Sequence, residues 1–228
     1  MYLFNLFIKK KEVNSRNLLL IKSRCNMKML SFLLSVLLIA HPAMAQNGEV
    51  KEKFEISFSK KKNRGQFLYK GAAHSFTIEF DSEDIQTTQN ANFVIVNKQI
   101  VQTTCKPLND SDADHTSLTV EQQKELIGKY VDREMDYINH ELNMYYRNLK
   151  KEWVTMKSKL WLIWSFDIEN LKADEPASLR LKKQIYASTI CFNQLVDLNT
   201  PILQNTDPSD ARKLLTHIMP GLKLDNKR

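Results

Sequence analysis

Apolar and polar residues alternate through the first part of the chain, as in strands that bury one face. Phe54, Ile56 and Phe58 form one such run, and residues 76–80 form another. Between them lies a basic turn, after which the chain could return as a partner strand. We therefore expect strands over residues 54–58, 66–70, 76–80, 92–96 and 99–104, with the last two either separate or one long strand.

A long amphipathic helix is predicted in the middle of the chain. Thr119 and Gln122 form a capping box, in which each side chain satisfies a backbone N–H at the helix start. From Val120 to Leu149, apolar residues recur mostly at steps of three and four, which places them in one stripe. Such a helix would have about eight turns and a length of about 45 Å, so it must lie across a sheet.

Strand patterns return after this helix. Residues 160–168 are apolar on both faces, which predicts an interior strand with Leu162, Trp164 and Phe166 against the long helix. The remaining predicted strands are a short one over 153–156 and the segments 183–192 and 195–202, which are either two strands or one with a bulge. A helix over 211–219 follows, and Asp207 and Pro208 provide its start. Grouped strands with two helices indicate an α+β fold, with a mostly antiparallel sheet covered by one long central helix and a short C-terminal helix.

The N-terminal part has the features of an export signal. Lys28 precedes an apolar run that ends before Pro42, and Ala43 and Ala45 are the small residues that a signal peptidase reads before cleaving between Ala45 and Gln46. We expect residues 27–45 to be a signal peptide, and residues 1–26 to be a misassigned start or a leader. Residues 46–228 would then be a single α+β domain without a transmembrane anchor, located in the periplasm or secreted.

Removal of this signal changes the charge of the protein. The formal net charge of the whole chain is +7, but the first 45 residues hold seven of its 33 Lys and Arg and one of its 26 Asp and Glu. The remaining domain is therefore nearly neutral. A basic surface is the first requirement for binding nucleic acid, so we expect no nucleic-acid partner.

Two cysteines follow the cleavage site, Cys105 and Cys191. In an oxidising compartment an even pair is a candidate disulfide. The alternative is that both are buried thiols that pack as small apolar side chains.

An acidic loop before the long helix is a candidate calcium site. Asp110, Asp112 and Asp114 alternate, and Glu121 stands twelfth from Asp110, the position of the bidentate ligand in a calcium loop. His115 stands where such loops carry glycine, and a plain acidic surface loop is the alternative. If calcium binds, millimolar calcium should raise the melting temperature, and Glu121→Gln should abolish that rise.

The sequence contains no complete catalytic signature. Glycines are scattered, so no loop can bring several backbone N–H groups to a phosphate. A hydrolase would need an active site assembled from residues distant in the sequence, such as His74, His115 and Asp167. An inhibitor or immunity protein for a secreted enzyme is a further alternative.

The pattern of elements resembles that of the PsbP/DcrB-like family of exported domains. The resemblance rests on the strand at 76–80, the central helix, the apolar strands, and the ending in which a strand over 195–202 is followed by the segment from Ala211 to Leu224 with its short helix. It implies a sheet covered by helices and a non-catalytic binding or accessory role at the cell envelope or outside the cell. A protein partner is then expected more than a small molecule.

Overall fold

The computed structural model describes residues 53–59, 63–71, 74–88, 93–108, 118–141, 144–169, 180–204 and 207–226. All of them belong to one compact unit, Ala43–Arg228. The elements are, in chain order, β1 (Lys53–Ser59), β2 (Arg64–Lys70), β3 (His74–Asp81), β4 (Ile85–Thr87), β5 (Phe93–Val96), β6 (Gln99–Pro107), α2 (Val120–His140), β7 (Tyr146–Met156), β8 (Lys159–Ile168), β9 (Leu181–Cys191), β10 (Gln194–Leu203), α3 (Pro208–Ile218), the 3₁₀ turn η3 (Met219–Gly221) and β11 (Leu222–Asn226).

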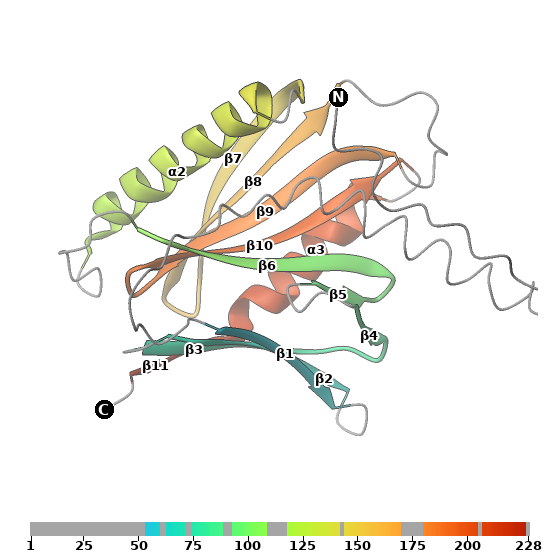
Figure 1. Ribbon diagram of the computed structural model, residues 1–228, viewed down its shortest axis with the longest axis vertical. Helices are drawn as coiled ribbons and strands as arrows, with labels where there is room; N and C mark the ends of the chain where they lie inside the picture. Colours follow the sequence, from blue (N-terminus) through green and yellow to red (C-terminus); the bar gives the residue numbers. More distant parts are fainter. Residues whose placement is uncertain are drawn as a thin grey trace, which may run out of the picture. The chain divides into compact units, whose positions relative to one another are not determined.

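The strands form two antiparallel sheets (Figure 1). The larger has seven strands in the order β4-β5-β6-β10-β9-β8-β7, and the smaller has four in the order β1-β2-β3-β11. Helix α2 covers one face of the larger sheet, and α3 lies on its other face, which also looks toward the smaller sheet. The α+β class and the antiparallel pairing predicted from the sequence are confirmed.

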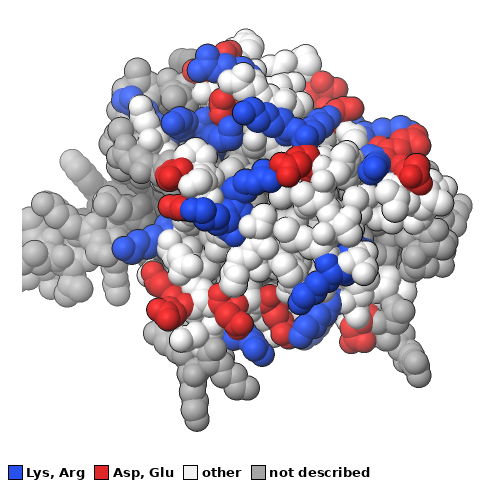
Figure 2. All heavy atoms as spheres, turned by 180° about the vertical axis from the view of Figure 1, so that it is seen from behind, with Lys and Arg blue, Asp and Glu red and all other residues white. Residues whose placement is uncertain are grey.

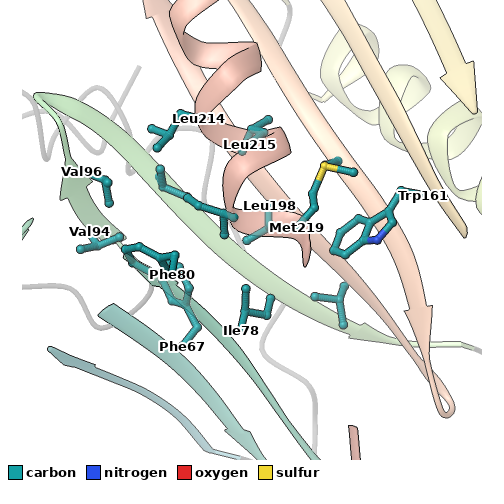
Figure 3. Packing of buried hydrophobic residues seen from close by; sticks show 14 of the residues in the cluster. Phe67, Ile78, Phe80, Val94, Val96, Trp161, Leu198, Leu214, Leu215 and Met219 are labelled. Atoms are coloured by element: carbon teal, nitrogen blue, oxygen red, sulfur yellow. The ribbon is translucent and has the colours of Figure 1, made fainter. Parts of the chain in front are cut away.

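The main hydrophobic core lies between the two sheets and α3 (Figure 3). Phe67 and Phe80 of the smaller sheet pack with their ring centroids 5.6 Å apart. Trp161 from β8 and Leu198 from β10 face them across the core, and both are fully buried. The apolar side of α3 closes this space with Ala211, Leu214, Leu215, Ile218 and Met219. The two sheets are therefore joined by one continuous core.

Helix α2 begins where the sequence predicts but ends early. The Thr119 and Gln122 capping box is present, with both of its hydrogen bonds formed. The prediction of an eight-turn helix reaching Leu149 is wrong, because α2 has 21 residues and ends at His140. Met144 N–H donates back to the carbonyl of Ile138, and the chain then enters β7. In β7 the backbone groups of these residues form hydrogen bonds with β8. An exposed extension of the helix would give them no additional hydrogen bonds.

The segment predicted as an interior strand is β8, which pairs with β7 on one side and β9 on the other. Leu162, Trp164 and Phe166 are buried. Trp164 is linked through Ser188 and Asp197 to Tyr130 of α2, so these alternate residues lie on the side of the sheet that carries α2, as expected. Strands β4 and β11 were not predicted, and neither was the division into two sheets. No helix among the described ranges is long and apolar enough to cross a membrane.

Candidate functional site

The proposed calcium ligands are only partly within the described residues. Glu121 lies exposed in the first turn of α2, while Asp110, Asp112 and Asp114 lie outside the described ranges. Across the described residues, no three His, Cys, Asp or Glu side chains are placed to hold a metal ion. The calcium site stays a prediction. The cleavage site at Ala45 and Gln46 also lies outside the described residues.

Cys105 and Cys191 do not form the disulfide that the sequence allowed. Both remain thiols, on strands β6 and β9, and β10 runs between these strands. Cys105 is paired with Val196 of β10, and Cys191 with Gln194 of the same strand. Two strand spacings amount to about 9.5 Å, and a disulfide needs Cα atoms within about 7 Å. Burial raises the pKa of Cys191 to about 12, so this thiol is held in its unreactive form.

The residues suggested for a hydrolase are not brought together. The His74 ring stacks on Phe192, at the turn that follows β9, with a centroid distance of 4.1 Å. Asp167 instead pairs with Lys183, near the start of β9. Nine residues of extended strand separate Lys183 from Phe192, which is about 30 Å. His115 lies outside the described residues. A site that uses both His74 and Asp167 is therefore not supported.

A buried polar network lies beneath α2. The hydroxyl groups of Tyr130 and Ser188 both donate to the carboxylate of Asp197, and the Trp164 indole N–H donates to Ser188 over 2.8 Å. Beside it, Lys106 forms an ion pair with Glu134 and also lies 5.1 Å from the Tyr130 ring centroid. Asp197 is 1% exposed.

This network is closed to ligands, because α2 lies directly on it. Burial raises the pKa of Asp197 to about 6, although the hydrogen bonds from Ser188 and Tyr130 act in the opposite direction. Among the described residues of α2, Tyr130 is the one that donates a hydrogen bond to this carboxylate. The arrangement fixes how α2 sits on the sheet, and we assign it a structural role.

An open groove of about 640 Å³ lies on the opposite face of the sheet, beside the N-terminal half of α3. Its floor consists of the β8 and β9 residues Ile163, Ser165 and Ile185. Strand β7 forms one wall and the start of α3 forms the other. The walls contribute Lys150, Lys151 and Glu152 from β7 and Pro208, Ser209 and Arg212 from α3, and Lys183 of β9 also lines the groove. The ammonium group of Lys151 pairs with Asp132 of α2, on the other face of the sheet, and so does not add its charge to the groove. The groove thus combines a largely apolar floor with the basic groups of Lys150, Lys183 and Arg212 and the acidic group of Glu152.

Two of the basic side chains are held in place by carboxylates. Lys183 Nζ lies 2.9 Å from Asp167, and Arg212 lies 2.7 Å from Glu152. Partial burial pushes the pKa of Asp167 up, but hydrogen bonds from Asn148 and Lys183 outweigh it and leave that pKa below its ordinary value. Asp167 therefore stays ionised at neutral pH and keeps Lys183 positioned.

Lys150 gives the groove positive charge that nothing offsets. It is exposed on β7, opposite Ser165, and it has no acidic partner among the described residues. The first turn of α3 adds the partial positive charge of a helix N-terminus, although Asp207 caps it. Seen from behind, the molecule carries Lys and Arg side chains with Asp and Glu side chains among them (Figure 2). The groove can therefore bind an anionic group next to an apolar one.

The sequence did not indicate this groove. Its basic residues come from β7, β9 and α3, and they are spread over more than sixty positions. Only the pairing of β7, β8 and β9 brings Lys150, Ser165 and Ile185 side by side. The one signal in the sequence that could have pointed to the groove is the pair of adjacent basic residues Lys150 and Lys151 in one strand.

No protein-family model and no curated protein sequence matches the chain. Among solved structures, the chain is similar to the solution structure of a cyanobacterial PsbP (CyanoP) from Synechocystis sp. PCC 6803. The sequence identity is 7%, the TM-score is 0.38, and the match covers 81% of this chain and 99% of the other.

Proposed function

We propose that residues 46–228 are an exported, non-catalytic binding or accessory domain that acts at the cell envelope or outside the cell. Its binding site is the groove beside α3, and its ligand is an acidic part of a protein partner. The observation that carries this proposal is the uncompensated charge of Lys150 beside the ion-paired Lys183 and Arg212 in an open, partly apolar groove. Export itself rests on the signal pattern that ends at Ala45.

The charge arrangement favours binding over chemistry. Asp167 and Glu152 already orient Lys183 and Arg212. These two side chains would therefore lose little further conformational freedom when a ligand binds. Lys150 supplies the unpaired charge that attracts the ligand. The lining residues include a serine pair, Ser165 and Ser209, but no histidine that could activate a hydroxyl nucleophile.

A binding experiment with an acidic peptide tests this function. Fluorescence anisotropy of a labelled hexaglutamate peptide should show saturable binding that weakens as salt is added. Lys150→Glu should weaken the binding at least tenfold, because it reverses the one basic charge in the groove that lacks a partner. The matched control is Lys129→Glu, which makes the same charge change on α2, away from the groove.

Equal effects of the two variants would show that the peptide responds only to net charge, which would contradict the groove as the site. The absence of any saturable binding would contradict the proposed function itself. Lys150 is exposed and lies on an edge strand, so its replacement should leave the fold intact. Unchanged melting of Lys150→Glu would confirm this.

A further inference from the structure

Strand β7 lies at one edge of the seven-stranded sheet. It has 11 residues and pairs only with β8 among the described strands. At the other edge of this sheet, β4 has only three residues. The backbone N–H and C=O groups on the outer side of a long edge strand can pair with another extended chain. The groove opens beside this same strand, because Lys150 and Glu152 of β7 line it.

The turn between β7 and β8 determines which backbone groups of β7 face outward. Lys157 and Ser158 form a two-residue hairpin turn, both with positive φ, so Met156 and Lys159 are a hydrogen-bonded pair. Pairs alternate along an antiparallel ladder. Every second residue of β7 therefore points its N–H and C=O away from β8, and these residues are Lys151, Trp153 and Thr155.

The first part of β7 cannot pair with an added extended chain. The register with β8 shifts between Arg147 and Lys150, and Asn148 in this irregularity has a φ of 54°. Such bulges twist an edge away from further pairing. The regular stretch that remains runs from Lys150 to Met156, which is seven residues and long enough for a strand.

The charge along this edge selects the partner. Between Arg147 and Lys159, five residues are basic and Glu152 is the single acid. Arg147 and Lys151 already pair with Glu169 and Asp132, so the uncompensated charges on this edge among the described residues are Lys150, Lys157 and Lys159. A second copy of the same strand would bring like charges together, which opposes self-pairing. An acidic strand would instead place carboxylates opposite lysines, with alternate side chains pointing into the groove.

We propose that the partner presents an extended acidic segment that adds to β7 as an eighth strand, with every second side chain in the groove. This rests on the proposed function, since the groove supplies the charge recognition. The backbone of Lys151, Trp153 and Thr155 supplies the hydrogen bonds, and Lys150 receives a carboxylate from the added strand.

Backbone methylation tests the strand pairing separately from the charge. The probe is a nine-residue peptide of alternating Glu and Thr, in an unmodified form and in two forms N-methylated at alternate residues. One methylated form should bind at least tenfold more weakly, because its methyl groups replace the N–H groups that face β7. The other should bind as well as the unmodified peptide. Thr155→Pro, which removes an outward N–H, should also weaken binding tenfold, whereas Thr155→Ala should not.

The outcomes separate this inference from the proposed function. If the peptide binds and Lys150→Glu weakens it, but both methylated forms and Thr155→Pro bind normally, strand addition is overturned and the groove remains the binding site. If the two methylated forms are weakened equally, strand addition is also overturned. If the unmodified peptide shows no binding, the proposed function fails together with this inference.

Discussion

Replacement of Gly221 by alanine is expected to destabilise the protein by about 3 kcal/mol, the upper end of the usual cost of overpacking. A Cβ atom at this position would lie 1.6 Å from the carbonyl oxygen of Glu79. That oxygen belongs to the backbone of β3, so it cannot move aside as a side chain could. Gly221 ends the 3₁₀ turn after α3, and β11 pairs with β3 directly afterwards, from Leu222 opposite Ile78.

The effect should be visible in thermal unfolding. A loss of 3 kcal/mol corresponds to a decrease in melting temperature of about 6–12 °C for a protein of this size. Gly128→Ala is the matched control, because nothing lies within 4 Å of a Cβ there. Gly128 is inside α2, where alanine is favoured by about 1 kcal/mol, so this variant should melt slightly higher. If Gly221→Ala also melts at or above the wild-type temperature, β11 does not approach β3 as described.

The starts of the helices could be predicted from the sequence because capping is local chemistry. Thr119 with Gln122, and Asp207 with Pro208, act within one turn of the chain and do so in the structure. The end of α2 was different. The apolar spacing continues to Leu149, but Tyr145 is 54% exposed and the residues after it pair with β8 instead. A strand partner that lies far along the chain decided where this helix ends.

The smaller sheet was not predicted for the same reason, because it depends on pairing between segments that lie far apart in the sequence. Residues 222–226 after α3 are too few and too polar to predict a strand, yet β11 completes the smaller sheet beside β3. This joins the two ends of the domain, since about 140 residues separate the partners Ile78 and Leu222. The groove has the same origin, because its walls come from β7 and from α3. Sequence patterns report which face of an element is buried, but not which element covers it.

Asp197 shows that the environment of a single residue was not predictable from the sequence. It stands in the segment 195–202, whose apolar character predicted a strand, and nothing in the sequence sets it apart from an exposed acid. In the structure it is enclosed by groups from three elements besides its own strand. Tyr130 and Glu134 face it from α2, Lys106 from β6, and Ser188 from β9. The strand pairing and the helix above it create a buried carboxylate.

This carboxylate should make stability depend on pH in the direction opposite to that of ordinary acid denaturation. The pKa of Asp197 is raised from 3.8 to about 6 in the folded protein. Between these values the folded state holds a proton that the unfolded state has released, so the free energy of unfolding falls as pH rises. The contribution is fully present below the unfolded pKa and is lost as pH rises through about 6. Between pH 5 and pH 7 the change should be about 1.4 kcal/mol.

Asp197→Asn isolates this contribution, because the amide keeps the shape of the side chain and can still bond to the hydroxyl groups of Ser188 and Tyr130. Urea unfolding of both proteins at several pH values from 5 to 7.5 gives the difference between them, in which contributions common to both proteins cancel. The carboxylates of Glu79 and Asp167 have lowered pKa values, so they stay ionised throughout this range and do not contribute. We expect the wild-type protein to lose about 1.4 kcal/mol relative to Asp197→Asn between pH 5 and pH 7. Parallel profiles would mean that Asp197 takes up no proton on folding, and that its carboxylate is ionised beneath α2 at all these pH values.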